Sequence, residues 1–146
     1  MNGFFAMRRI LIVSTLVAAI PLVASAQQSK ATYVEAAKVA AGGTFTTTAD
    51  YTVQMLKRTA AGQVEVHTKE TDIFYVVDGE ATVVTGGTMV GGTETQPNQL
   101  RGTSIDGGET YHLKKGDAIT IPAGVPHWFK EVPQSIQYFT VKSIKP

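Results

Sequence analysis

The sequence contains no cysteine among its 146 residues. This absence excludes disulfide bonds, catalytic thiolates, zinc sites built on thiolates and lipid attachment at cysteine. The net charge is only +1 at pH 7, so the composition does not predict a surface for nucleic acid. A phosphate-binding loop, a dinucleotide fingerprint, a serine nucleophile elbow and a zinc-protease helix are also missing. What remains is an ordinary globular composition of a size that fits one domain.

Residues 1–26 have the pattern of a signal peptide. Two arginines precede the almost wholly apolar stretch 10–23, and Ala24-Ser25-Ala26 supplies a cleavage site. The rival interpretation is an uncleaved membrane anchor, but the apolar stretch is shorter than the ~20 residues that a spanning helix needs. We therefore expect export to the bacterial periplasm or the outside of the cell, with no membrane partner after cleavage.

The expected cleavage can be tested by intact-mass measurement of the exported protein. The mature chain should begin with Gln27, directly after the small residues of the cleavage site. An exported protein that still carries Arg8 would contradict this prediction.

Residues 27–43 are rich in alanine and end at a pair of glycines, which indicates an N-terminal arm with a short helix. A loosely ordered linker is the open alternative for this stretch. From residue 44 to residue 146 the pattern changes to a period of two, which is typical of strands, and glycine-rich turns separate the segments. Asp78-Gly79 is the strongest hairpin signal among these turns. The expected strands cover residues 51–56, 64–69, 73–77, 81–84, 103–105, 110–113, 118–121, 127–132 and 136–142.

The segment from Gly116 to His127 delivers a histidine at the end of a strand. It reads Gly-Asp-Ala-Ile-Thr-Ile-Pro-Ala-Gly-Val-Pro-His. Pro122 cannot donate to a sheet ladder and therefore stands where pairing stops. Gly124 permits a close approach of the backbone, and Pro126 fixes the backbone just before the histidine. This pattern indicates a functional site at His127.

The spacing of this segment resembles the second motif of the cupin family. That motif is a glycine, five residues, Pro-x-Gly, two residues and a histidine, and the match here is complete up to His127. The family usually has asparagine after three further residues, where this chain has Glu131. The resemblance implies an antiparallel jelly-roll β-barrel over residues 44–146, closed around a central pocket. It also indicates a homodimer, which would cover exposed sheet edges.

The first motif of the family, His-x-His followed by a glutamate and a glycine, is present in altered form. Counting back from Gly79 places Asp72 at the glutamate position, with Glu65 and His67 at the His-x-His pair. A second frame, with His67 as the first histidine, leaves too few residues before Asp72. Residues i and i+2 of a strand share a face, so Glu65 and His67 are expected to point together.

The resemblance implies that His67, His127, Asp72 and Glu65 hold a divalent metal ion, with iron, manganese, zinc and nickel as candidates. Asp72 is the expected carboxylate ligand, because it stands in the acidic position of the family. The alternative is that Glu65 faces solvent and Asp72 stabilises a turn. Outside this set, His112 is predicted to be a surface histidine and Arg58 an exposed arginine.

Two functions follow from the resemblance. One is a metal-dependent enzyme that acts on a small molecule, of the dioxygenase, isomerase or lyase type. The other is a non-catalytic cupin that binds a sugar or a small acid, with or without metal. Both imply a small-molecule ligand, and the fold alone does not decide between them.

Overall fold

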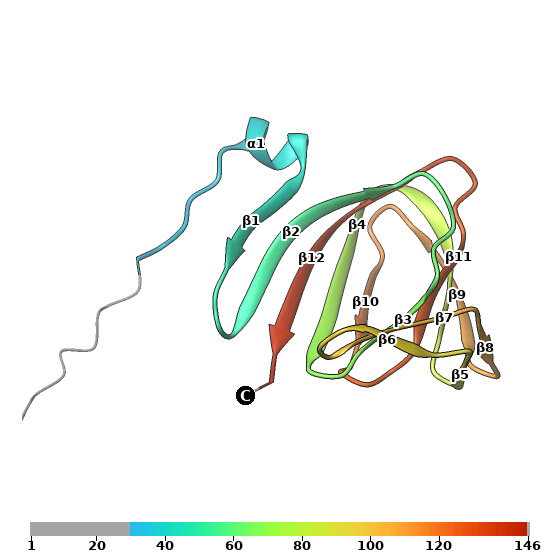
Figure 1. The fold of residues 1–146 in the computed structure, drawn as a ribbon. Helices are drawn as coiled ribbons and strands as arrows, with labels where there is room; N and C mark the ends of the chain where they lie inside the picture. The colour runs from blue at the N-terminus through green and yellow to red at the C-terminus, as the bar shows by residue number, and fades with distance from the viewer. Residues whose placement is uncertain (1–29, 146) are drawn as a thin grey trace, which may run out of the picture. The chain divides into compact units, whose positions relative to one another are not determined.

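The computed structural model describes residues 30–145. From Thr32 onward they form one unit, which contains the short helix α1 (Ala36–Ala41) and twelve strands (Figure 1). The strands are β1 (Gly43–Thr47), β2 (Tyr51–Arg58), β3 (Val64–His67), β4 (Glu70–Thr85), β5 (Thr88–Val90), β6 (Thr93–Gln96), β7 (Gln99–Gly102), β8 (Ser104–Asp106), β9 (Glu109–Lys114), β10 (Ala118–Ile121), β11 (His127–Glu131) and β12 (Ile136–Ile144).

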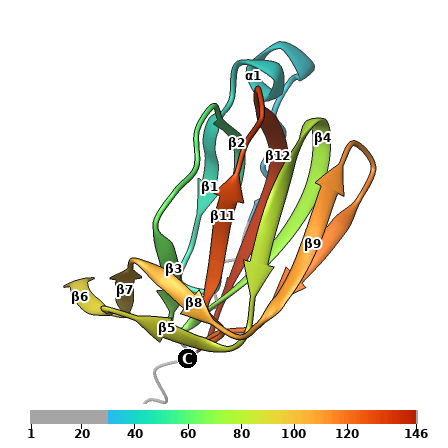
Figure 2. The ribbon, with the colours of Figure 1, turned by 90° about the vertical axis from the view of Figure 1, so that its right-hand side faces the viewer.

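The strands form two antiparallel layers, and β4 belongs to both of them (Figures 1 and 2). In the first layer the order is β1-β2-β12-β4, with β10 beside the first half of β4. In the second layer the other half of β4 lies between β9 and β11, and β3, β7 and β6 follow. The strands β5 and β8 form a separate small sheet. This arrangement confirms the expected all-β jelly roll.

The expectation of a closed barrel is wrong. The strand order of the main sheet ends at β1 on one side and at β6 on the other, and these two strands do not pair with each other. All four residues of β6 are exposed, and none of them is apolar. This strand therefore has no side chain to pack across to the first layer, and the fold is an open sandwich.

The predicted hairpin at Asp78-Gly79 is also wrong, because β4 continues through this dipeptide. Both residues are paired with β12, Asp78 with Gln137 and Gly79 with Ile136, and from Glu80 onward β4 pairs with β9. Gly79 has a φ of 75°, and a Cβ added there would lie 2.0 Å from the carbonyl oxygen of Ser135. The glycine therefore serves a close approach of two strands where β4 passes from one layer to the other.

The short helix predicted within residues 27–43 is present as α1, and it ends at Gly42 with a φ of 79°. Residues 27–29 and the predicted signal peptide lie outside the described residues. Within residues 30–145, no helix has the length and apolar character needed to cross a membrane.

The core lies between the two layers and follows the period-two pattern of the strands. Alternate residues of β4 and β12 point into it, which buries Phe74 and Val76 beside Ile136 and Tyr138. The buried hydrophobic cluster consists of Phe74, Val76, Ala81, Val83, Leu113, Ile121, Phe129, Ile136 and Tyr138. Three of these side chains, Phe74, Phe129 and Tyr138, also line the cavity of the candidate site.

Candidate metal centre

Three cross-strand pairs bring the predicted site residues together. His127 on β11 is the register partner of Glu65 on β3. On the other side of β3, His67 pairs with Gln99 of β7. In the opposite layer, Asp72 near the start of β4 pairs with Lys142 of β12. The strand that carries His127 therefore lies directly beside β3.

The turn before His127 is attached to the segment that carries His67. The amide of Gly124 donates to the carbonyl oxygen of His67 at 2.8 Å, and the amide of Ala123 donates to the Thr71 hydroxyl at 3.2 Å. Gly124 has a φ of 85°, a conformation that glycine adopts readily. A Cβ added at Gly124 would meet nothing within 4 Å, so the glycine is needed for its positive φ and not for the close approach predicted from the sequence. The two hydrogen bonds join the two motifs.

The four predicted ligands converge on one point. His67 Nε2 lies 3.4 Å from Glu65 Oε2 and 3.4 Å from Asp72 Oδ2. His127 Nε2 lies 3.8 Å and 3.5 Å from the same two oxygens. The two imidazole ring centroids are 5.1 Å apart. His67, His127 and Asp72 are buried, and the Glu65 side chain is 18% exposed.

The hydrogen bond at Nδ1 determines the tautomer of His127. This nitrogen lies 3.3 Å from the carbonyl oxygen of Val125. A carbonyl oxygen only accepts hydrogen bonds, so Nδ1 must carry a proton to make this contact. In the neutral ring, Nε2 then presents a lone pair to the two carboxylates.

The same argument applies to His67 through Gln99 and Glu70. Gln99 Nε2 donates to Glu70 Oε2 at 3.3 Å, which leaves its Oε1 in contact with His67 Nδ1. Because this amide oxygen accepts, the proton of a neutral His67 lies on Nδ1 and its Nε2 is a free acceptor. Contacts of this kind at the second ring nitrogen are the usual way in which metal-binding histidines are oriented.

Four acceptor atoms therefore face one another without a proton between them. Two carboxylate oxygens and two Nε2 lone pairs repel each other unless a cation lies among them. With metal–ligand bonds of about 2.0–2.2 Å, the ligand atoms of a tetrahedral site are about 3.3–3.6 Å apart. The four separations between an imidazole nitrogen and a carboxylate oxygen, 3.4–3.8 Å, are close to this range, and Glu65, His67 and His127 form a group whose ligand atoms lie within 4.8 Å of one another. The donor set thus fits a first-row divalent ion.

The other oxygen of Glu65 is bound by Arg58. Arg58 Nη2 lies 3.2 Å from Glu65 Oε1, and its Nε donates to the Tyr138 hydroxyl at 3.1 Å. The guanidinium also lies 4.6 Å from the centroid of the Phe129 ring. The expectation of an exposed surface arginine is wrong, because Arg58 points inward on β2 and its side chain is only 28% exposed.

Lys142 binds the other oxygen of Asp72, as Arg58 does for Glu65. Its Nζ lies 2.7 Å from Asp72 Oδ1 and 3.2 Å from Glu70 Oε2. Asp72 is 2% exposed, so it does not serve as a surface turn residue. Its side chain is shorter than that of the family's usual glutamate, but it still reaches both histidines. A second acidic group of His67, Glu70 and Asp72 is also present, but the Lys142 ammonium already lies between its two carboxylates.

The electrostatics of the site favour a charged Glu65 carboxylate and a neutral His127 imidazole. Burial acts to raise the pKa of Glu65, but the contact with the His67 ring and the positive charges of Arg101 and Arg58 outweigh it and lower the pKa to about 2. Burial lowers the pKa of His127, and the charge of Asp72 opposes this shift only in part.

A cavity of about 40 Å³ lies at the centre of these residues. A water molecule occupies about 30 Å³ in the liquid, so the space is small. Three aromatic side chains, Phe74, Phe129 and Tyr138, line the cavity. The cavity is lined by Leu56, Arg58, Glu65, His67, Asp72, Phe74, His127, Phe129, Tyr138, Thr140 and Lys142.

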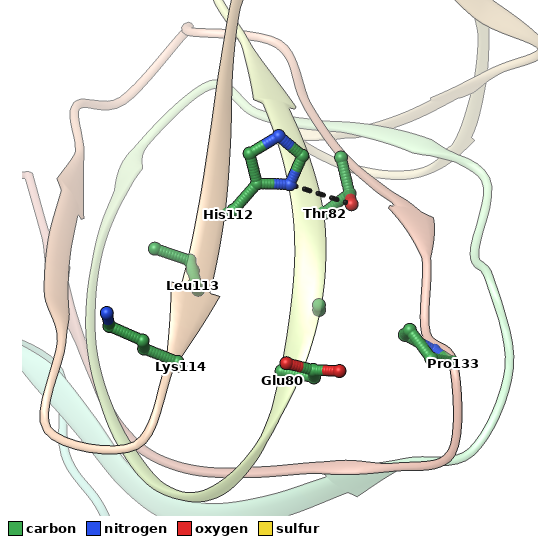
Figure 3. A pocket seen from close by; sticks show the side chains of 7 residues that line it. Glu80, Thr82, His112, Leu113, Lys114 and Pro133 are labelled. Carbon is green, nitrogen blue, oxygen red and sulfur yellow. Dashed lines mark hydrogen bonds between the residues drawn. The ribbon is translucent and has the colours of Figure 1, made fainter.

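His112 does not belong to this site. It lies on β9 with its side chain on the outer face, where Nδ1 is 3.3 Å from the Thr82 hydroxyl. Its neighbour Leu113 points into the core, as predicted. A pocket of about 270 Å³ opens on this face, and Figure 3 shows His112, Glu80 and Lys114 around it.

Solved structures of three proteins are similar to this chain. BH2720 from Bacillus halodurans has a TM-score of 0.52 and 16% sequence identity, over 72% of this chain and 70% of that chain. KdgF from Halomonas sp. has a TM-score of 0.51 and 20% sequence identity, over 72% of this chain and 80% of that chain. The cupin domain of Cnp3 from Schizosaccharomyces pombe has a TM-score of 0.51 and 12% sequence identity, over 71% of this chain and 64% of that chain. At these identities the likeness shows the fold alone.

A comparison with curated proteins gave no match. The family model described as cupin matches residues 23–146, which includes both motifs and every residue of the site described above. The open jelly roll and its structural relatives agree with this match. The chain therefore belongs to the cupin family.

Proposed function

We propose that this cupin is an exported, divalent-metal-dependent enzyme that acts on a small molecule, of the dioxygenase, isomerase or lyase type. The observation that carries the proposal is the set of four facing acceptors, in which each imidazole nitrogen lies 3.4–3.8 Å from both carboxylate oxygens beside a small cavity. His67, His127, Asp72 and Glu65 would hold the ion. Iron or manganese would supply oxygen activation or polarise a bound enolate, and zinc would supply Lewis acidity.

The surrounding residues prepare this donor set for a metal ion. Val125 and Gln99 orient the two imidazoles so that both Nε2 atoms face the cavity. Arg58 and Lys142 each bind one oxygen of a carboxylate and leave the other directed at the histidines. Phe74, Phe129 and Leu56 line the remaining wall with apolar surface, which limits access of water.

A metal-free small-ligand-binding cupin is the second candidate, and one observation favours it. The carboxylates of Glu65, Glu70 and Asp72 lie beside cationic groups, with Lys142 and Arg58 in direct contact. These cations neutralise much of the carboxylate charge without a metal ion. In that state the pocket would bind a ligand or exchange protons through an imidazole.

Metal content decides between these two functions. The purified protein should be freed of metal with a chelator and then given iron(II), manganese(II), nickel(II) or zinc in turn. We expect one ion per chain, measured by elemental analysis after removal of excess metal. Negligible uptake of all four ions would refute the metal-dependent enzyme and leave the metal-free binding protein.

We also propose that the protein is a homodimer. On the outer face of the first layer, Ile73 and Tyr75 are 42% and 51% exposed, and they pair across strands with Val141 and Phe139. Apolar surface of this kind is suited to contact with a second copy. Light scattering at micromolar concentration should give twice the mass of one chain. Ile73→Lys places a charge in the apolar surface and should lower the measured mass toward that of one chain. A wild-type monomer would contradict the proposal.

A further inference from the structure

The hydroxyl of Thr140 is buried without a hydrogen-bond partner. Thr140 is 0% exposed, and its Oγ1 has no partner among the described residues. Buried hydroxyls are nearly always hydrogen-bonded, because leaving one unpaired is costly. The residue lines the same cavity as the four acceptors. A polar group in this position therefore indicates a partner that enters the cavity.

The neighbours of Thr140 are already engaged elsewhere. Tyr138 and Lys142 precede and follow it on the inward face of β12, and they contact Arg58 and Asp72. Its register partner on β2, Gln54, donates to the Thr44 hydroxyl at 2.9 Å. These contacts leave the Thr140 hydroxyl directed at the cavity rather than at a neighbouring side chain.

The size of the cavity limits what this partner can be. Its volume of about 40 Å³ is close to the share of one liquid water, about 30 Å³. Sites for drug-sized ligands are larger, about 300–1,000 Å³. The space is suited to a molecule of about one to three non-hydrogen atoms.

We propose that Thr140 is the hydrogen-bond partner of a small ligand, such as a di- or triatomic molecule or anion, that binds the metal ion from within this cavity. The inference rests on the proposed function, because the ligand needs the ion as its second partner. It assigns Thr140 a positioning role and predicts that the group that binds the metal ion has few non-hydrogen atoms.

The test uses cobalt(II) as the bound metal, because its absorption spectrum changes when a ligand binds to it. Cobalt-loaded wild type, Thr140→Val and Thr140→Ser should each be titrated with azide and, separately, with benzoate. Azide should bind wild type, and its affinity should fall about tenfold in T140V, as expected for loss of a hydrogen bond to a charged group. T140S, which keeps the hydroxyl, should stay within about threefold of wild type. Benzoate should leave the spectrum unchanged.

Thermal unfolding of the metal-free protein provides a second readout that does not depend on activity. Valine has nearly the shape of threonine but no hydroxyl to desolvate, so metal-free T140V should melt at a higher temperature than metal-free wild type. Equal azide affinities for T140V and wild type, or binding of benzoate as tight as that of azide, would overturn the inference. Wild type that takes up cobalt but does not respond to azide would overturn it and leave the proposed function intact. Failure to take up cobalt, together with negligible uptake of iron(II), manganese(II), nickel(II) and zinc, would overturn both.

Discussion

Replacing either His67 or His127 by alanine should abolish stoichiometric metal binding. Each imidazole supplies one of the two nitrogen ligands, and both Nε2 atoms lie within 3.8 Å of the same carboxylate oxygens. Loss of one nitrogen ligand should lower metal affinity by about a hundredfold or more, since changes in the residues around ligands already cost 10–100-fold. Elemental analysis of reconstituted protein gives the occupancy, and competition with a chelator gives the affinity.

His112→Ala is the matched control for both variants. It removes the same chemical group from the outer face, where His112 contacts Thr82 and not the site. All three variants should keep the fold, because the core cluster does not include a histidine. Retention of one tightly bound ion by His67→Ala or His127→Ala would contradict the site.

The two carboxylates should differ in their contribution to the metal affinity. Asp72 Oδ2 lies 3.4 and 3.5 Å from the two Nε2 atoms, whereas Glu65 Oε2 lies 3.4 and 3.8 Å from them. Asp72 is also the more buried residue. Asp72→Asn should therefore lower metal affinity more than Glu65→Gln, and the reverse order would identify Glu65 as the main oxygen ligand.

Replacing Lys142 by methionine should destabilise the metal-free protein by about 3 kcal/mol, the low end of the range for breaking a buried ion pair. The variant leaves the buried carboxylate of Asp72 without the ammonium that lies 2.7 Å away. A divalent ion between Asp72 and the histidines would replace part of the lost charge. Loss of the competing ammonium should also tighten metal binding, so a fixed excess of metal should raise the free energy of unfolding more in this variant than in wild type.

Lys115→Met is the control for this experiment. Lys115 also faces an aspartate, Asp78, but at 4.0 Å and with both side chains more than two-thirds exposed. Exposed pairs contribute about 0–1 kcal/mol, so the control should lose little stability. Urea unfolding curves, measured with and without metal, give both values. A Lys142→Met variant as stable as Lys115→Met would show that the Asp72 carboxylate does not depend on this ion pair.

The sequence predicted most of the strands and the residues that meet at the site. The alternation on β3 places Glu65 and His67 on one face, and the proline and glycine pattern before β11 delivers His127. These are local signals, since each depends on residues a few positions apart. The altered positions of the family motif, Glu65 and Asp72, also converge with the histidines.

The residues that the sequence did not identify are those placed by long-range register. Lys142 and Asp72 are 70 positions apart, and only the pairing of β12 with β4 brings them together. Period-two alternation on β12 puts Thr140 and Lys142 on one face, but the pattern does not say what that face meets. Asp78-Gly79 failed as a hairpin signal for the same reason, because the continuing ladder with β12 overrides the local turn preference.

The position of β12 has a consequence for the order of folding. This strand follows all the others along the chain, yet it lies between β2 and β4 and pairs with both of them. The first layer therefore remains split until β12 inserts, and contacts so distant along the chain form slowly. During synthesis, β2 and β4 would keep unpaired edges until the last strand is available. We expect the site to assemble in one late step, when β12 brings Lys142 to Asp72.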